Sequence, residues 1–124
     1  MKVLVVEDEE NNYFYVEEIL HNAGCEVVRS GNGLDAVETI KFDPDFDIIL
    51  MDLQIPLLNG YDTTRRIKEI LKGIPIIATT ARVTRQDQIM AYESGCCGFL
   101  AKPFTPRELL SIMSNFVTFE KIKN

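Results

Sequence analysis

The sequence has no excess of basic residues and no long apolar segment. Its 124 residues contain 13 lysines and arginines against 19 aspartates and glutamates, which gives a formal net charge of -6. This acidic balance argues against non-specific binding to nucleic acid or to an anionic membrane surface. No apolar run is long enough to span a bilayer, and no signal peptide is apparent. We therefore expect neither nucleic acid nor a membrane among its partners.

Cysteines are few, and their positions do not suggest a metal site. Cys25, Cys96 and Cys97 form an odd set without the spacing of metal ligands. Adjacent cysteines rarely pair with each other, so the simplest interpretation is reduced thiols in a cytoplasmic protein. The sequence also contains no internal repeat, low-complexity segment or linker. Its length suits one domain, and we expect that domain to cover residues 1–119, with a polar tail at 120–124.

Short apolar segments recur along the chain. The most informative is Ile48–Asp52, an apolar run that ends abruptly in a carboxylate. A continuous apolar run of strand length is typical of a strand covered on both faces, as in a parallel sheet. Further segments are predicted to be strands on similar grounds: 2–6, 26–29, 75–79 and 97–101.

Segments with helical spacing separate these strands. The expected helices cover residues 11–23, 34–40, 61–72, 85–94 and 106–116. Thr84 and Thr105 are the predicted N-caps of the last two helices. Each is followed three residues later by an acid, Asp87 or Glu108, in the spacing of a capping box.

Strand and helix alternate along the whole chain, a pattern that predicts an α/β fold of the (βα)5 type. Parallel strands joined through helices give a doubly wound sandwich, in which helices cover both faces of a five-stranded parallel sheet. For a chain of this length the expected strand order is 2-1-3-4-5, the flavodoxin-like arrangement. In that order the first and third strands flank the point where open α/β sheets bind their ligands.

Acidic side chains follow both of these strands. Glu7 and Asp8 come directly after the first strand, and Asp52 ends the third. Carboxylates packed in one crevice repel one another, so we expect a hard divalent cation among them, Mg²⁺ or Mn²⁺. Thr80 and Lys102 follow the fourth and fifth strands, where they offer a hydroxyl and a positive charge to a phosphoryl group. An aspartate in this setting is a nucleophile that can form an acyl phosphate.

The motifs at these strand ends resemble the receiver domain of two-component response regulators. They are VVEDEE, ILMDLQIPLLNG, PIIATTA and GFLAKPF, and the resemblance covers essentially the whole chain. It implies that Asp52 is the phosphoacceptor, that Asp8 binds the metal directly and that Glu7 acts through metal-bound water. The backbone carbonyl of Gln54 matches the third protein ligand of the metal. Lys102 matches the invariant lysine of the family.

The same resemblance implies switching and tuning roles. Thr80 matches the hydroxyl that moves towards the phosphoryl group, and Phe99 occupies the position of an aromatic ring that turns inward with it. The family often has tyrosine there, and Phe99 lacks the hydroxyl that would bond a partner's backbone. Gln54 and Arg82 match two positions that tune dephosphorylation. The peptide bond before Pro103 is expected to be cis.

By this resemblance the protein is a signalling domain that phosphorylates and dephosphorylates itself, rather than a turnover enzyme. Its phosphodonor would be a phosphohistidine of a histidine kinase or a histidine phosphotransfer protein, and its output a contact with a downstream protein. The motifs are similar to those of stand-alone cell-cycle regulators and phosphorelay receivers, and no residues are left for a DNA-binding output domain. A receiver domain cut from a hybrid histidine kinase is an alternative. We expect a monomer or a weak, phosphorylation-dependent dimer.

Two groups of residues are candidate contact surfaces. Tyr13–Tyr15 cannot all face the core from consecutive positions, so exposed rings there would form a docking surface for the helices of a phosphodonor. The alternative for this segment is partial packing. Arg82, Arg85 and Gln88 are expected on or before the fourth helix, a face that receivers often use for output, or else they are ordinary solvated residues.

Other classes of protein share parts of this pattern. A flavodoxin-like protein that binds FMN would need a phosphate loop rich in hydroxyls and glycine after the first strand, where this chain has acids. A Mg²⁺-dependent phosphohydrolase of the haloacid-dehalogenase kind also forms an aspartyl phosphate. It would need a second aspartate two residues after the nucleophile, where Gln54 follows Asp52 and Glu10 follows Asp8.

Overall fold

Parallel strands form one five-stranded sheet in the computed structural model, which describes residues 1–119. The strands are β1 (Lys2–Val6), β2 (Glu26–Ser30), β3 (Ile48–Asp52), β4 (Ile76–Thr80) and β5 (Gly98–Ala101). They lie in the order β2-β1-β3-β4-β5, and each is parallel to its neighbours. The predicted fold class and strand order are confirmed. The expected polar tail at 120–124 lies outside the described residues.

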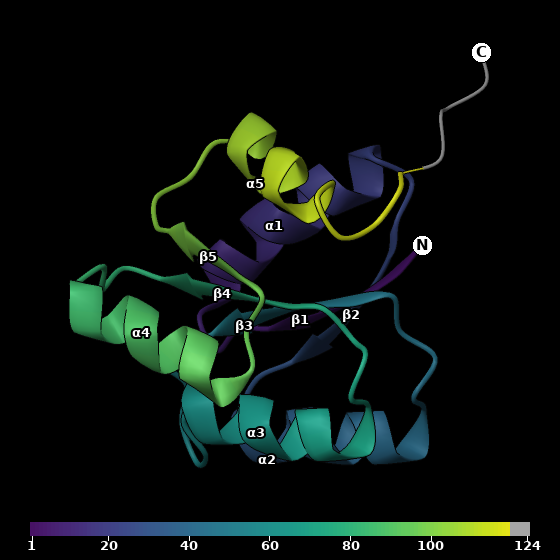
Figure 1. Cartoon of the computed structure of the whole chain (residues 1–124). Helices are drawn as coiled ribbons and strands as arrows, with labels where there is room; N and C mark the ends of the chain where they lie inside the picture. The colour runs from purple at the N-terminus through teal and green to yellow at the C-terminus, as the bar shows by residue number, and fades with distance from the viewer. Residues whose placement is uncertain (120–124) are drawn as a thin grey trace.

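Helices cover both faces of the sheet. They are α1 (Glu10–Asn22), α2 (Gly33–Phe42), α3 (Gly60–Ile70), α4 (Arg85–Ser94) and α5 (Pro106–Met113). Helices α1 and α5 lie on one face, and α2, α3 and α4 lie on the other (Figure 1). Within the described part of the chain, none of these helices has the length and apolar character needed to cross a membrane.

Strand β3 is buried along its whole length, as its unbroken apolar sequence predicted. Side chains of a strand alternate between the two faces of the sheet. Ile49 and Met51 therefore pack on the side of α2, α3 and α4, whereas Ile48 and Leu50 pack on the side of α1 and α5. Because both cores hold this strand, its last residue, Asp52, has a fixed position at the carboxyl edge of the sheet.

Side-chain hydrogen bonds fix the starts of the helices. Thr105 and Glu108 form the predicted capping box of α5, and Thr84 caps α4 as predicted. Sequence reasoning missed the cap of α1, where the Glu9 carboxylate accepts a hydrogen bond from the backbone N–H of Asn12 at 2.7 Å. This cap ties the acidic segment after β1 to the first turn of the helix.

Three helices end earlier than predicted, and the first of them, α1, ends at Asn22, one residue short of the expected end. Helix α3 ends at Ile70 rather than at Lys72, because Leu71 leaves the helical conformation and packs against the core on that side of the sheet. Helix α5 ends at Met113, so Phe116 lies beyond it and is 40% exposed, instead of forming part of the buried stripe. The serine and asparagine that follow Met113 are poor helix formers, which favours the early end.

The three cysteines are free thiols, as predicted. Cys96 packs in the core on the side of α2, α3 and α4, whereas Cys97 lies against the opposite core. Burial raises the pKa of both of these thiols and of Cys25, so all three are poorer nucleophiles than a free cysteine. Strand β5 begins at Gly98, one residue later than predicted.

The first residue of α3, Gly60, lies directly against the backbone that carries Asp52. A Cβ atom on Gly60 would lie 2.5 Å from the Leu53 Cα and 2.6 Å from the Asp52 carbonyl oxygen. We expect Gly60→Ala to lower the free energy of unfolding by about 2–3 kcal/mol, because backbone atoms have little freedom to move away. Urea denaturation measures this difference. Gly73→Ala is the matched control, since a Cβ there meets nothing within 4 Å; equal losses in the two variants would contradict the prediction.

Candidate functional site

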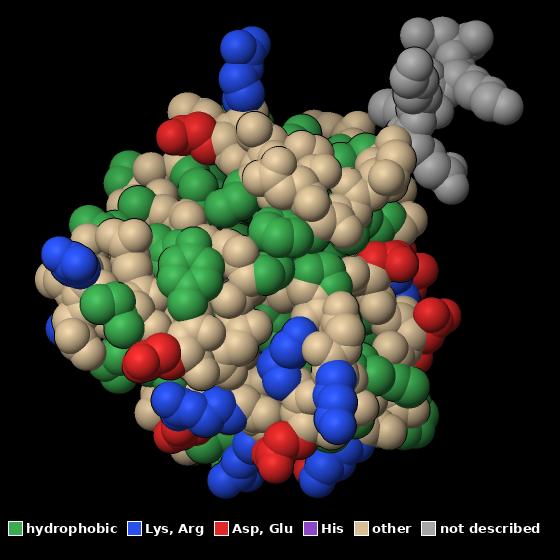
Figure 2. Space-filling model, in the orientation of Figure 1, with side chains coloured by type: hydrophobic (Ala, Val, Ile, Leu, Met, Phe, Trp, Pro, Cys, Tyr) green, Lys and Arg blue, Asp and Glu red, His purple; other side chains and the backbone are tan. Residues whose placement is uncertain are grey.

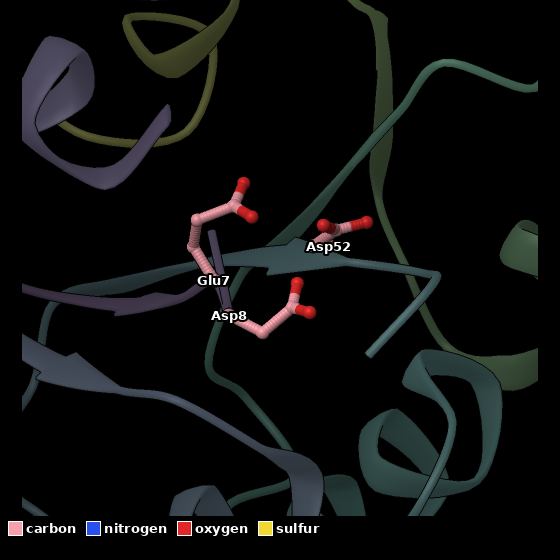
Figure 3. A group of neighbouring side chains, drawn as sticks. All are labelled: Glu7, Asp8 and Asp52. Atoms are coloured by element: carbon pink, nitrogen blue, oxygen red, sulfur yellow. The ribbon is translucent and has the colours of Figure 1, made fainter. Parts of the chain in front are cut away.

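Three acidic side chains meet at the carboxyl ends of β1 and β3. Glu7 and Asp8 directly follow β1, and Asp52 is the last residue of β3. The two strands are neighbours, but the chain leaves them towards opposite faces of the sheet, which opens a crevice between them. Figure 3 shows the three carboxylates pointing into the same space. One oxygen from each carboxylate lies within 4.8 Å of the others.

The chemistry of this donor set suits a hard divalent cation. All three ligands offer carboxylate oxygens, which Mg²⁺ and Mn²⁺ prefer over nitrogen or sulfur. Glu7 and Asp52 are only 3% and 6% exposed, whereas Asp8 is exposed to solvent. A cation that enters from the Asp8 side would therefore keep part of its water shell while it contacts the buried acids.

Lys102 contacts two of the three acids, and its side chain is largely buried. Its Nζ atom donates to Glu7 Oε1 at 2.7 Å and to Asp52 Oδ2 at 3.2 Å. The lysine follows β5, where its backbone N–H donates to the Thr80 carbonyl at 2.8 Å. The peptide bond between Lys102 and Pro103 is cis, as predicted. The lysine thus places one positive charge against two buried carboxylates.

Burial and the contact between Glu7 and Lys102 have opposite effects on the pKa of each of these two side chains. The pKa of the Glu7 carboxyl is raised, chiefly by burial and also by the negative charge of Asp52. The hydrogen bond from Lys102 lowers this pKa but does not cancel the increase. Burial lowers the pKa of Lys102, but its hydrogen bond to Glu7 and the charge of Asp52 more than reverse this, so its pKa is raised. Lys102 therefore stays protonated, and Glu7 depends on it to keep a charge in this buried position.

Backbone and lysine together orient the Asp52 carboxylate. Its Oδ1 atom accepts a hydrogen bond from the backbone N–H of Gln54 at 2.9 Å, while Oδ2 faces Lys102. The contact between Gln54 and Asp52 in the structure is therefore made by the backbone N–H of Gln54. The metal-binding role of the Gln54 carbonyl stays a prediction. The Gln54 side chain is exposed.

Thr80 lies at the end of β4, next to β3, and is 1% exposed. Its Oγ1 atom accepts a hydrogen bond from the backbone N–H of Arg82 at 3.1 Å. Phe99 is partly buried in β5 and packs on the side of α2, α3 and α4. The Arg82 side chain is 65% exposed, and its Nε atom lies 3.7 Å from a carboxylate oxygen of Asp87. The structure leaves the switching role of Thr80 and Phe99 and the tuning role of Arg82 as predictions.

Sequence reasoning missed Arg29, the next-to-last residue of β2. Its Nε atom donates to the Glu7 carbonyl at 3.2 Å, and a terminal nitrogen donates to the Asp8 carbonyl at 3.3 Å. Its guanidinium carbon lies 4.9 Å from the centre of the Tyr13 ring, in cation–π geometry. Arg29 therefore ties the backbone of both acids to β2 and α1. No local motif signals this contact, because it joins residues from separate elements.

The aromatic residues at the start of α1 divide between core and surface. Tyr13 is buried, whereas Phe14 and Tyr15 are 54% and 44% exposed. The Tyr15 hydroxyl donates to the Phe104 carbonyl at 2.7 Å, which links α1 to the segment after β5. A hollow of about 480 Å³ opens between these elements beside Lys102. The expected exposure of one or two of these rings is confirmed; their role in docking stays a prediction.

Fold and site together define a class of protein. It is a flavodoxin-like α/β protein whose switch point carries carboxylates and a lysine, a combination suited to a divalent cation and a phosphoryl group. The response regulator receiver domain is the family whose sequence model matches, over residues 3–114. The chain belongs to this family. Receiver domains are signalling domains rather than classical turnover enzymes.

Several relatives support the assignment. The chain is 36% identical over 124 residues to the probable transcriptional regulator ycf29 of Pyropia yezoensis, covering 98% of this chain and 55% of that protein. It is 34% identical to the polar-differentiation response regulator DivK of Brucella anthropi, covering 90% of this chain and 93% of DivK. The chain spans about half the length of the first curated relatives it matches.

A solved structure shares both fold and sequence with the chain. It is the receiver domain of the sensor histidine kinase PA1611 from Pseudomonas aeruginosa PAO1, with a TM-score of 0.86 and 35% sequence identity. The match covers 93% of this chain and 95% of that domain. In that structure a magnesium ion is coordinated in the active-site cleft.

Proposed function

We propose that the protein accepts a phosphoryl group on Asp52 from a phosphohistidine, with Mg²⁺ as the cofactor. The observation that carries the proposal is the position of Lys102, whose Nζ atom lies 3.2 Å from Asp52 Oδ2, beside an acidic group that fits a divalent cation. A phosphoryl group on Asp52 would lie within reach of this ammonium group. Asp8, Asp52 and the Gln54 carbonyl would hold Mg²⁺, and Glu7 would act on it through a water molecule.

The reaction exchanges one bond to phosphorus for another. A carboxylate oxygen of Asp52 attacks the phosphorus, a P–O bond forms, and the P–N bond to the donor imidazole breaks, with the electron pair left on that nitrogen. Lys102 stabilises the negative charge on the phosphoryl oxygens during this transfer. A bound Mg²⁺ supplies further neutralisation of that charge. Water later hydrolyses the acyl phosphate, and Gln54 and Arg82 tune that step.

Phosphorylation changes the contacts that the protein makes. The Thr80 hydroxyl moves towards the phosphoryl group, and Phe99 turns into the space that it leaves. Both residues adjoin the face formed by α4, β5 and α5. Figure 2 shows hydrophobic side chains gathered on this face. Helix α4 carries the exposed apolar side chains of Ile89 and Tyr92, and Val83 is exposed just before it. An apolar, partly exposed face of this kind suits a downstream protein target.

The phosphodonor is a histidine kinase or a histidine phosphotransfer protein, which docks near Phe14 and Tyr15 on α1. Both rings are exposed on the helix that begins beside the acidic group. The match to almost the full length of DivK favours a stand-alone regulator. Its place is the cytoplasm, as a monomer or a weak phosphorylation-dependent dimer. The match to the PA1611 receiver domain favours the alternative, a receiver that is part of a hybrid histidine kinase.

Incubation with acetyl phosphate and Mg²⁺, followed by intact-mass measurement, tests the proposal. We expect one added phosphoryl group, which peptide mapping places on Asp52. A chelator should abolish the addition, because repulsion between three carboxylates and an incoming phosphate is then unscreened. Addition of Mn²⁺ to the chelated protein should restore it. Equal labelling with and without chelator would contradict the role of the metal.

A further inference from the structure

A second group of polar side chains lies beside the phosphorylation site, around Asp87 on α4. The Asp87 carboxylate accepts hydrogen bonds from the Thr84 hydroxyl at 2.6 Å and from the Tyr61 hydroxyl at 3.4 Å. Its Oδ2 atom also lies 3.7 Å from the Nε atom of Arg82. The Asp87 side chain is only 10% exposed. One buried carboxylate thus joins α3, α4 and the loop between β4 and α4.

The loop tied in this way is the one that follows Thr80. Its residue Arg82 contacts Asp87 through the side chain and Thr80 through the backbone N–H, which donates to Thr80 Oγ1 at 3.1 Å. A hollow of about 440 Å³ lies between these residues and the segment that follows β3, and Gln54 and Tyr61 also line it. The loop therefore has space beside it, but the side chains of Arg82 and Thr84 contact Asp87.

Charge supports this description of the contacts. The Thr84 hydrogen bond and the nearby Arg82 lower the pKa of Asp87 despite its burial, so the carboxylate is ionised. Burial, and then the charge of Asp87, raise the pKa of the Tyr61 hydroxyl, so Tyr61 remains a hydrogen-bond donor. An ionised acceptor makes stronger hydrogen bonds than a neutral one, which favours a loop held in a single position.

We propose that Asp87 is a positioning residue, which fixes the loop between β4 and α4 through Arg82, Thr84 and Tyr61 and thereby restrains phosphoryl transfer to Asp52. The inference rests on the proposed function, in which the Thr80 hydroxyl moves towards the phosphoryl group. In the present conformation the Arg82 N–H of the loop donates a hydrogen bond to Thr80 Oγ1, and Asp87 contacts the Arg82 side chain of the same loop. Loosening the contacts to Asp87 lowers the cost of the movement and speeds the transfer.

Tyr61→Phe isolates the contact between α3 and α4, because it removes only the hydroxyl that donates to Asp87. We expect it to raise the initial rate of phosphorylation by acetyl phosphate at saturating Mg²⁺ by about two- to fivefold, since a hydrogen bond of this length is weak. Asp87→Asn removes the charge that holds Arg82 as well, and should raise the rate further. Tyr92→Phe is the matched control, because Tyr92 lies on the same helix α4 with its side chain exposed.

Amide hydrogen exchange of Arg82, measured by NMR without a phosphodonor, is the second readout. Its N–H donates to Thr80 Oγ1, so we expect faster exchange in Tyr61→Phe and Asp87→Asn than in the wild type, and no change in Tyr92→Phe. Unchanged exchange in both variants would overturn the inference, as would phosphorylation at or below the wild-type rate. A wild-type protein that accepts no phosphoryl group would defeat the proposed function, while the exchange of Arg82 would still show whether Asp87 holds the loop.

Discussion

Asp52→Asn should accept no phosphoryl group from acetyl phosphate, even at saturating Mg²⁺. An amide has nearly the same shape as a carboxylate but is not a nucleophile, so no acyl phosphate can form. The variant should fold normally, because the Gln54 N–H can still donate to the side-chain oxygen and Lys102 keeps its shorter contact to Glu7, at 2.7 Å. Intact-mass measurement after incubation should therefore show only the unmodified protein.

An exposed aspartate provides the control for this variant. Asp45→Asn removes the same charge from an exposed position before the start of β3, at the opposite edge of the sheet from the acidic group, and should be labelled at the wild-type level. Magnesium affinity, measured by calorimetry, should fall in Asp52→Asn alone, because the charge of the ligand set drops. Full labelling of Asp52→Asn would move the acceptor to another residue and would defeat the proposed function.

Much of this site could be predicted from the sequence because each of its residues ends a strand or lies within two residues of a strand's end. Parallel strands deliver the residues that follow them to one edge of the sheet, so Glu7, Asp8, Asp52, Thr80 and Lys102 converge whatever the details of packing. The three central strands, β1, β3 and β4, were recognisable because burial on both faces requires a largely apolar run. The fold and the acidic group thus depend on local sequence signals plus one topological rule.

The contacts that support the site could not be predicted in the same way. Arg29 reaches the carbonyls of Glu7 and Asp8 from another strand, and no pattern within β2 distinguishes it from a surface arginine. Asp87 was recognisable only by its spacing from Thr84, which is that of a capping box, although its carboxylate accepts from the Thr84 hydroxyl instead of the Thr84 backbone N–H. Its contacts to Tyr61 and Arg82 depend on how α3 and α4 pack. Such contacts join side chains across elements, so they require coordinates.

Helix ends were also poorly predicted, for a related reason. Leu71 has the apolar character of a helix position, but packing against the core favours a non-helical conformation. Phe116 continues the spacing of α5, yet the weak helix formers before it end the helix at Met113. Hydrophobic spacing therefore locates a helix well, whereas its last turn depends on competition between local propensity and tertiary contacts.

Lys102→Met should lower the rate of phosphorylation by acetyl phosphate about 10²- to 10³-fold, the usual effect of removing one charged donor from a transition state. In the absence of metal it should also lower the free energy of unfolding by about 3 kcal/mol at neutral pH, because Glu7 and Asp52 lose their buried counter-charge. Magnesium should restore part of that stability, since a cation can then neutralise the same carboxylates.

Magnesium affinity separates two possible reasons for slow phosphorylation of Lys102→Met: loss of a charge that contacts the phosphoryl group, and loss of the metal. Magnesium affinity should be equal to or higher than that of the wild type, because a positive charge beside the ligand set has been removed. Methionine fills similar volume, and Lys72→Met, at an exposed lysine, is the control for both rate and stability. Urea denaturation with and without Mg²⁺, together with the rate of labelling, measures these outcomes. A variant that is labelled at the wild-type rate would show that Lys102 does not contact the transferring phosphoryl group.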